Sequence, residues 1–226
     1  MRLPSPGNYT VPVLIPYTVD VPMARVPFAN FALIAVTVFI SVLAFGVDLE
    51  AVEPLVLVGW RPLGLLGHMF IHLDPLHLAG NLVFLWVFGN AVCAKVGNGI
   101  YLLAYVGLGL IAAVAHNLLD GRPAVGASGA INGVVGLFLI LYPLNDISCF
   151  YFVFIRGGVF SLSSIWMILL WLAFDIWGAA AGGGNVAYMA HVGGFAGGAA
   201  LGVLLLKSGW IEMDRSEKSL LQVLGR

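Results

Sequence analysis

Four polar side chains fall at one predicted depth in an otherwise apolar sequence. His77 and Asn81 open one long apolar stretch. Ser128 opens a second stretch, and His191 lies in the first turns of a third. A serine hydroxyl is a weak nucleophile until a neighbouring base accepts its proton, and histidine is the usual base. Segment 126–129 (Gly-Ala-Ser-Gly) places Ser128 at a loop-to-helix junction, where free backbone N–H groups could stabilise an oxyanion. These residue types indicate nucleophilic catalysis by a serine.

Small residues provide a means of bringing these side chains together. Two stretches carry them at helical steps: Gly129, Gly133 and Gly136 in the second, and Ala190, Gly194, Gly198 and Gly202 in the third. Such ridges let helix backbones approach closely in lipid, so Ser128 and His191 are expected to meet. His77 and Asn81 are four residues apart, hence on one helix face, and both could donate to the same oxyanion. Asn132, one turn below Ser128, could contact His191.

The composition predicts that membrane-spanning helices position these residues. Apolar residues make up 61% of the 226-residue chain and charged residues 9%, against roughly 45–50% and about 25% in soluble domains. Six gaps of 18 or more residues contain no Asp, Glu, Lys or Arg, and a spanning helix needs about 20 mostly apolar residues. This pattern excludes a soluble enzyme, a disordered chain and a coiled coil, and predicts an all-α polytopic membrane protein. The expected spans are 28–47, 76–93, 99–119, 127–142, 162–178 and 186–206.

The distribution of Lys and Arg predicts the orientation of the spans. With the N-terminus inside, eight Lys and Arg residues fall in cytoplasmic segments, and only Arg61 and Arg122 fall outside. We therefore expect both termini to be cytoplasmic. The second, fourth and sixth spans then enter the membrane from outside, which puts the four polar residues near its outer face.

The other segments divide the chain into three parts. Residues 1–27 hold six prolines, which predict an extended tail without helix. Residues 28–206 form the six-helix membrane domain, with a long first loop at 48–75. Within this domain, the apolar segment 147–160 is interpreted as a partly interfacial connection. Residues 207–226 form a mixed-charge cytoplasmic tail. No signal peptide is evident, because the prolines interrupt any apolar run near the start.

Charge, cysteines and histidines exclude other kinds of site. The net charge of −1 offers no basic surface for nucleic acid. Cys93 and Cys149 lie in or beside apolar segments and are expected to be buried thiols without a disulfide. His77, His116 and His191 are widely separated and lack a carboxylate or cysteine at ligand spacing, so we expect no metal.

Each catalytic signal alone has an ordinary explanation. Glycine-rich spans occur wherever helices pack tightly, a lone Ser in Gly-x-Ser-Gly is a weak signal, and a membrane histidine often serves packing. His116, at the outer end of the third span, is interpreted as structural. A channel or transporter would also place polar groups at one depth, but an inverted-repeat transporter would show internal symmetry, and we find no convincing repeat. The coincidence of four polar groups at one level is what favours an enzyme.

Several motifs follow one another along the chain in a specific order. They are Trp60-Arg61 in the first loop, His68-Met-Phe-Ile-His72 and His77-Leu-Ala-Gly-Asn81 before and in the second span, Gly126-Ala-Ser128-Gly129 at the fourth, and Ala190-His191-Val-Gly-Gly194-Phe-Ala-Gly-Gly198 in the sixth. With these motifs and six spans, the sequence resembles the rhomboid family of intramembrane serine proteases over about residues 28–206.

The resemblance implies a role for each matching residue and a rhomboid-like bundle as the fold. Ser128 would be the nucleophile, and His191 the general base and then the general acid for the leaving amine. His77 and Asn81, with the backbone N–H of Ser128, would form the oxyanion hole. Gly126 and Gly129 would support the site, and Asn132, which is not part of the matched motifs, is a further candidate for such support. The resemblance also implies a Ser–His dyad that works without a cofactor.

Three positions depart from the family pattern. The family often has Glu where Cys93 stands and Gln where Asp175 stands, and some members have an aromatic residue at Asn132. Asp175 is interpreted as a carboxylate at the membrane–water interface. The alternative is that its charge influences the site or the lateral gate, the opening between helices through which a substrate would enter. Without an Asp partner, the orientation of His191 is expected to come from packing. Trp60-Arg61 would hold the first loop in the outer leaflet.

The predicted function is an intramembrane serine endopeptidase that cleaves transmembrane segments of single-pass membrane proteins near the outer membrane face. The alternative is a catalytically inactive rhomboid-like protein that binds membrane clients, against which the intact Ser128 and His191 argue. The expected partners are the substrate and the lipid bilayer, and the oligomeric state is open. A prokaryotic cell membrane is the expected location, because no transit peptide precedes the first span.

Overall fold

The computed structural model describes residues 13–153, 156–182, 184–214 and 216–225, and six apolar segments within them are helical. These are α1 (Phe28–Phe45), the helix that runs through α4 (Pro75–Phe84), η3 (Leu85–Gly89) and α5 (Asn90–Val96), α6 (Asn98–Leu119), α7 (Ser128–Leu141), α8 (Ser164–Ala180) and α9 (Tyr188–Lys207). By length and composition, α1, α4–α5, α6 and α9 could each cross a membrane, while α7 and α8 are shorter. The predicted helical bundle is therefore confirmed, with ends that differ by a few residues from the expected spans.

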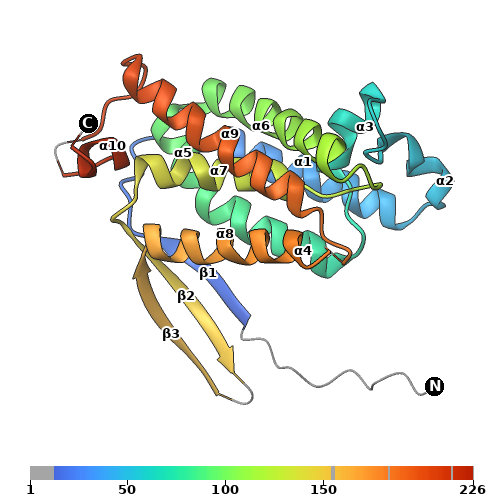
Figure 1. The fold of residues 1–226 in the computed structure, drawn as a ribbon, viewed down its shortest axis with the longest axis horizontal. Coiled ribbons are helices and arrows are strands. Elements are labelled where there is room, and N and C mark those ends of the chain that lie inside the picture. Colours follow the sequence, from blue (N-terminus) through green and yellow to red (C-terminus); the bar gives the residue numbers. More distant parts are fainter. Residues whose placement is uncertain (1–12, 154–155, 183, 215, 226) are drawn as a thin grey trace.

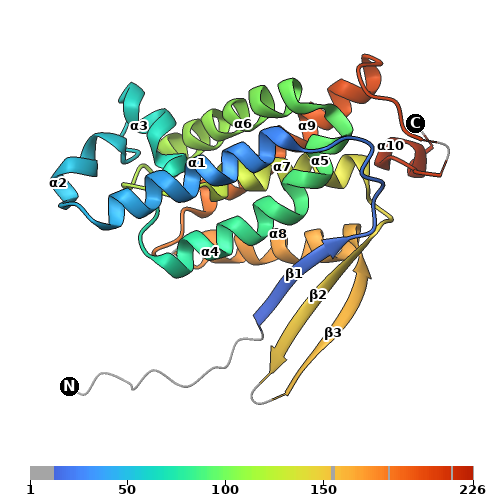
Figure 2. The ribbon, with the colours of Figure 1, turned by 180° about the vertical axis from the view of Figure 1, so that it is seen from behind.

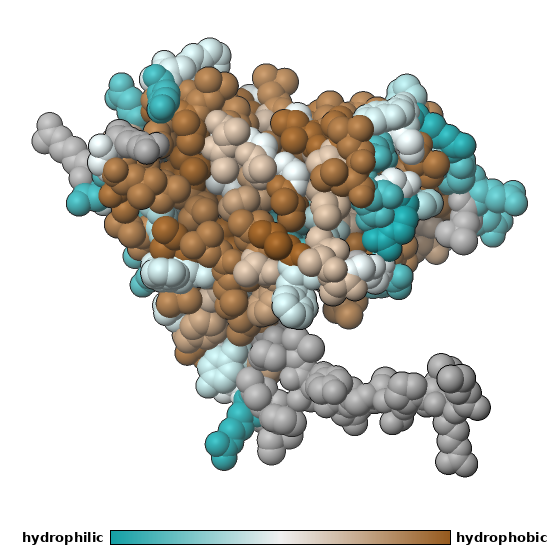
Figure 3. All heavy atoms as spheres, viewed as in Figure 1, coloured by the Kyte–Doolittle hydropathy of each residue, from teal (hydrophilic) through white to brown (hydrophobic). Residues whose placement is uncertain are grey.

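Apolar side chains also cover the outside of the bundle. Figure 3 shows hydrophobic residues over the middle of one face and hydrophilic residues gathered toward its ends. Phe39, Leu103 and Trp177 are 65%, 78% and 75% exposed. A soluble protein rarely exposes large contiguous apolar areas, whereas lipid acyl chains cover them. The surface therefore agrees with the composition in indicating a membrane protein.

Helix α7 lies inside the bundle, packed along α9 (Figures 1 and 2). Most of its side chains are buried. A Cβ atom on Gly194 would overlap the carbonyl oxygen of Gly129, and one on Gly198 would overlap that of Gly133. The two helices thus touch backbone to backbone, as the glycine steps predict, and this contact brings their first turns to the same end of the bundle.

The helix after the first loop has a side-chain cap at its start and an irregular turn in its middle. Asp74 caps it, because its Oδ1 accepts a hydrogen bond from the backbone N–H of His77 at 2.8 Å. Midway, η3 is a π-helical turn, and Asn30 from α1 donates to the carbonyl oxygen of Leu85 at 2.9 Å there. A polar side chain that inserts into the hydrogen-bond ladder is a common cause of such a turn.

A three-stranded antiparallel sheet replaces part of what the sequence indicated as tail and connection. Its order is β1 (Val13–Val19), β2 (Asp146–Val153) and β3 (Arg156–Ser163), and it extends away from the helices beside α8 (Figures 1 and 2). Along β2, Ile147 and Cys149 are buried, while Phe150 and Phe152 are exposed. This period of two is typical of a strand, so the interpretation of 147–160 as a partly interfacial connection missed a hairpin. The predicted tail before residue 13 lies outside the described residues.

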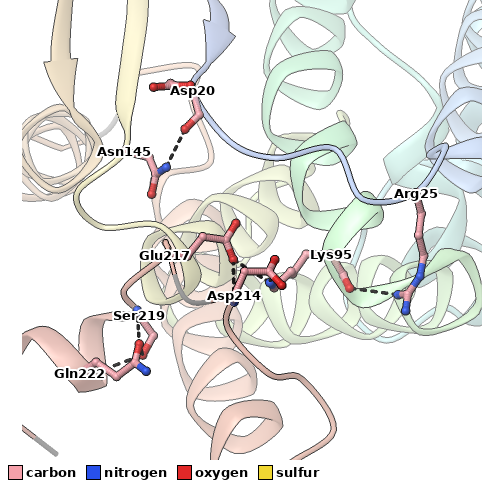
Figure 4. A network of polar contacts seen from close by, with 8 residues as sticks. All are labelled: Asp20, Arg25, Lys95, Asn145, Asp214, Glu217, Ser219 and Gln222. Atoms are coloured by element: carbon pink, nitrogen blue, oxygen red, sulfur yellow. Dashed lines mark hydrogen bonds and ion pairs between the residues drawn. The ribbon is translucent and has the colours of Figure 1, made fainter.

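Polar contacts tie the segment just before α1 and the segment after α9 to the bundle at the end opposite the predicted site. Lys95 Nζ lies 3.0 Å from Asp214 Oδ2 and 2.7 Å from Glu217 Oε2, and Glu217 is buried (Figure 4). Arg25 donates to the carbonyl oxygen of Lys95 at 3.1 Å. A buried carboxylate is costly without a partner, so Lys95 fixes the start of the C-terminal segment. The short helix α10 (Leu220–Val223) follows.

Short helices fill the first loop. They are α2 (Leu49–Val52), η1 (Glu53–Leu55), α3 (Pro62–Gly67) and η2 (His68–Phe70). Arg61 pairs with Glu53 at 2.5 Å, and both side chains are 55% exposed, so this ion pair contributes little stability by itself. Asn117 of α6 donates to the carbonyl oxygen of Gly59 at 2.5 Å and attaches the loop to the bundle.

Candidate active site

Ser128 and His191 meet at the start of α7 and α9. Ser128 Oγ lies 2.8 Å from His191 Nε2, within hydrogen-bond distance. Ser128 is the first residue of α7, and His191 lies in the first turn of α9. A Cβ atom on Gly129 would come within 3.3 Å of Ala190 Cβ, so the small residues beside the pair set its distance. A nucleophile and a base in direct contact are the arrangement that serine catalysis requires.

The other ring nitrogen of His191 faces a carboxylate. His191 Nδ1 lies 3.0 Å from Asp175 Oδ1 of α8, and the two side chains are 13% and 17% exposed. This contact favours the alternative interpretation of Asp175, an electrostatic influence on the site. Asn132 does not orient His191 as expected, because its amide donates to the carbonyl oxygen of Ser128 at 3.0 Å.

The loop before Ser128 is held by the first loop at three successive points. Leu57 and Ala124 exchange backbone hydrogen bonds of 2.9 and 3.1 Å. The N–H of Gly126 donates to the carbonyl oxygen of His68 at 2.8 Å. The N–H of Ala127 donates to His72 Nε2 at 3.4 Å. The first loop thus fixes the backbone immediately before the nucleophile.

His72 is a buried, neutral support of that backbone. Because Nε2 accepts from Ala127, Nδ1 carries the proton and donates to Ser41 Oγ at 2.9 Å. Ser41 Oγ in turn donates to the carbonyl oxygen of Phe70 at 2.9 Å. Burial, and secondarily the nearby His77, lowers the pKa of His72 to about 4. From the sequence, His72 was only part of a motif, since its partners lie 31 and 55 residues away.

Acidification is expected to destabilise the protein through His72. A histidine whose folded-state pKa is depressed stabilises the fold above its unfolded pKa of about 6.5 and loses that contribution as pH falls toward the folded value of about 4. Lowering the pH from about 7 to about 4.5 should remove roughly 2 kcal/mol of unfolding free energy through this group, allowing for partial access of water.

Unfolding of the detergent-solubilised protein at both pH values measures this effect. The control is His72→Gln, which keeps a polar side chain without the titration and should show a weaker pH dependence, while His68, whose pKa burial also lowers, contributes equally to both proteins. Equal pH dependence in the two proteins would contradict the role of His72.

The two candidate oxyanion donors, His77 and Asn81, differ in how they lie relative to the serine. His77 Nδ1 accepts from the N–H of Leu73 at 3.4 Å, so Nε2 carries the proton. Gly126 has φ +120°, and a Cβ atom there would lie 2.9 Å from His77 Nε2 and 3.9 Å from Ser128 Oγ. Asn81 lines the cavity, but its amide donates to the carbonyl oxygen of His77 at 2.9 Å. The geometry therefore brings His77 close to the serine and leaves Asn81 engaged with its own helix.

A cavity of about 1360 Å³ is lined by the polar side chains of the site, namely His72, His77, Asn81, Ser128, Asn132, Asp175 and His191. Its polar groups lie beside apolar walls that include Phe84 of α4 and Trp171 of α8, whose ring centroids are 5.0 Å apart. Arg122 donates to the carbonyl oxygen of Gly184 at 2.6 Å and so connects two loops near the cavity. His116 is 1% exposed, and its Nε2–H donates a hydrogen bond to the carbonyl oxygen of Arg122 at 2.7 Å. A cavity with mostly apolar walls on which several polar groups converge is the usual form of a binding site.

Comparison with known proteins assigns the fold to a family. The family model described as the Rhomboid domain matches residues 59–208, which is well over half of the chain and includes Ser128, His191, Asp175, His77 and Asn81. The chain belongs to the rhomboid family. It is accordingly a multi-pass integral membrane protein, as the apolar helices indicate. The predicted family membership is therefore confirmed.

Three relatives illustrate the similarity. The chain is 34% identical to the rhomboid protease GluP of Bacillus subtilis over 148 residues, which are 64% of this chain and 26% of that protein. It is 30% identical to the mitochondrial Rhomboid protein 1 of Saccharomyces cerevisiae over 172 residues, 73% of this chain and 46% of that protein. It is 28% identical to the rhomboid protease GlpG of Klebsiella pneumoniae over 134 residues, 59% of this chain and 45% of that protein. The chain thus spans less than half the length of each of these relatives.

Proposed function

We propose that this rhomboid is an intramembrane serine endopeptidase that cleaves transmembrane segments of single-pass membrane proteins. The contact of 2.8 Å between Ser128 Oγ and His191 Nε2 carries the proposal, because it joins a nucleophile to a base inside a cavity with apolar walls. Relatives named as rhomboid proteases support it. The same contact argues against the alternative of an inactive client-binding protein, which has no need of a serine paired to a base.

The reaction would run as acyl transfer through Ser128. His191 Nε2 accepts the hydroxyl proton as Ser128 Oγ attacks the peptide carbonyl, and a tetrahedral oxyanion forms. The N–H of Ser128, at the first position of α7, and the Nε2–H of His77 supply donors to this oxyanion. Asn81 adds a donor when its amide leaves the carbonyl oxygen of His77. The carbon–nitrogen bond then breaks, His191 protonates the departing amine, and water hydrolyses the acyl-enzyme by the same steps.

The substrate must present an unwound segment to this site. A helical backbone hides its carbonyl groups in hydrogen bonds, and in lipid these bonds are broken only where the chain lines a polar cavity. We therefore expect cleavage beside small side chains and near helix-weakening residues. The Lys and Arg distribution supports a site near the outer membrane face. Bacterial and mitochondrial relatives both match the chain, so the prokaryotic cell membrane stays a prediction.

Replacing Ser128 by alanine is expected to abolish cleavage of a single-pass model substrate co-reconstituted in proteoliposomes. The substitution removes only the hydroxyl group, and no other group supplies the nucleophile in the proposed reaction. The matched control is Ser148→Ala, which removes a hydroxyl from β2, bonded to Ser161 at 2.8 Å, and should leave cleavage unchanged. Cleavage by Ser128→Ala at the wild-type rate would overturn the proposed function.

A further inference from the structure

We propose that Asp175 is a positioning residue for His191, so that this site works as Ser128–His191–Asp175 instead of the dyad that the family resemblance implied. This inference rests on the proposed function. Its basis is a continuous line of contacts, with 3.0 Å from Asp175 Oδ1 to His191 Nδ1 and 2.8 Å from His191 Nε2 to Ser128 Oγ. Both ring nitrogens of His191 are therefore engaged by side chains of the site.

The first consequence is the choice of tautomer. An ionised carboxylate only accepts hydrogen bonds, so a contact with Asp175 requires the proton of neutral His191 to sit on Nδ1. The lone pair is then on Nε2, which is the nitrogen that faces Ser128. Without Asp175, either nitrogen could carry the proton, and the tautomer with the proton on Nε2 could not accept from the serine. Asp175 thus keeps His191 in the form that acts as a base.

The second consequence concerns charge. When His191 accepts the proton of Ser128, it becomes an imidazolium, and Asp175 stays ionised while the Nδ1 proton remains on the ring. With side chains only 13% and 17% exposed, the pair is partly withdrawn from water, where an ion pair is stronger than at the surface. The other groups around His191 are the ring of Tyr188, 6.1 Å away centroid to centroid, and His77 of α4. Among the residues described, Asp175 is the carboxylate that lies within ion-pair distance of His191.

The fold fixes the pair by close packing one turn away. A Cβ atom on Gly178 of α8 would overlap the ring of Tyr188 of α9. Gly178 lies three residues after Asp175, and Tyr188 lies three residues before His191, so this contact is on the same faces of both helices as the ion pair. The absence of a side chain at Gly178 lets the first turn of α9 approach α8 at the level of Asp175. The packing between α8 and α9 thus determines where the carboxylate of Asp175 lies relative to His191.

The test compares Asp175→Asn and Asp175→Glu with wild type in proteoliposomes. Asp175→Asn is nearly isosteric but uncharged, and its amide can donate to Nδ1 and stabilise the wrong tautomer, so kcat should fall about 10²–10⁴-fold. KM should stay within about threefold, because Asp175 acts on proton transfer and not on substrate binding. The rate of labelling by a fluorophosphonate should fall in parallel, since it also needs the base. Asp175→Glu restores the charge and should recover at least about tenfold of the lost kcat.

Two controls separate this role from a structural one. Asp146→Asn makes the same change in an exposed carboxylate of β2 at the other end of α7 and should retain wild-type kcat. The thermal unfolding midpoint of Asp175→Asn should stay close to that of wild type. If Asp175→Asn has the kcat of wild type while Ser128→Ala is inactive, the positioning role is overturned and the proposed protease function still holds. A loss of kcat that Asp175→Glu fails to recover, with an equal loss of folded protein, would overturn it as well. Cleavage by Ser128→Ala would instead overturn the proposed function.

Discussion

Replacing His191 by alanine is expected to lower kcat/KM for a transmembrane substrate by about 10³-fold or more. The imidazole is the group within 2.8 Å of Ser128 Oγ and would serve first as base and then as acid. Without it, the proposed reaction lacks the group that accepts the hydroxyl proton and later protonates the leaving amine. The folded structure should persist, because removing the ring adds no atoms to the contact between α7 and α9.

The double variant Ser128→Ala/His191→Ala makes this prediction sharper. Residues that act as one unit are strongly non-additive, so the double variant should be no less active than either single variant. Initial cleavage rates of all three proteins in proteoliposomes, each corrected for folded protein, give the comparison. If the fold-losses in cleavage rate of the two single variants multiply in the double variant, the two side chains act independently. If His191→Ala has wild-type activity, His191 has no role in the mechanism.

Gly198→Val is expected to separate α7 from α9 and to cost about 3 kcal/mol of unfolding free energy, the upper part of the range for overpacked sites. Even a single Cβ atom at this position would overlap the carbonyl oxygen of Gly133, and backbone atoms cannot move aside as a flexible side chain would. The separation would also pull Ser128 away from His191, which sit one or two turns above on the same helices. Loss of activity should therefore accompany loss of stability.

Gly107→Ala is the matched control for this substitution. Gly107 also lies within a spanning helix, α6, but a Cβ atom there would meet nothing within 4 Å. Alanine has a higher helix propensity than glycine by up to about 1 kcal/mol, so this variant should be as stable as wild type or slightly more so. Thermal unfolding in one detergent compares the two variants, and a Gly198→Val protein as stable as Gly107→Ala would contradict the backbone-to-backbone contact.

The sequence predicted the helical bundle and the meeting of Ser128 with His191 because both depend on local repeats. Apolar gaps define the helices, and glycine steps of four define the faces on which they touch. The contact of Asp175 could not be predicted in this way. Asp175 and His191 lie on different helices separated by a turn, so their distance depends on helix rotation and on the Gly178–Tyr188 contact, neither of which has a sequence period.

Two other features were missed for the same physical reason. The sheet pairs β1 with β2 across more than a hundred residues of sequence, and a short alternating strand is hard to distinguish from a helix when nearly every residue is apolar. His72 accepts a hydrogen bond from the N–H of Ala127, which is 55 residues away in the sequence. Nothing in the sequence around His72 indicates this partner. Contacts of single side chains with residues far away in the sequence could thus be identified only in the structure.

Intact mass and peptide mapping after reaction with a fluorophosphonate test the central claim most directly. We expect one covalent adduct per chain on Ser128, absent in Ser128→Ala and formed far more slowly in His191→Ala, because only a serine activated by an adjacent base reacts readily. The adduct should form in parallel with the loss of cleavage of a transmembrane substrate. A protein that cleaves the substrate while Ser128 stays unlabelled, or one whose adduct maps to another residue, would contradict it.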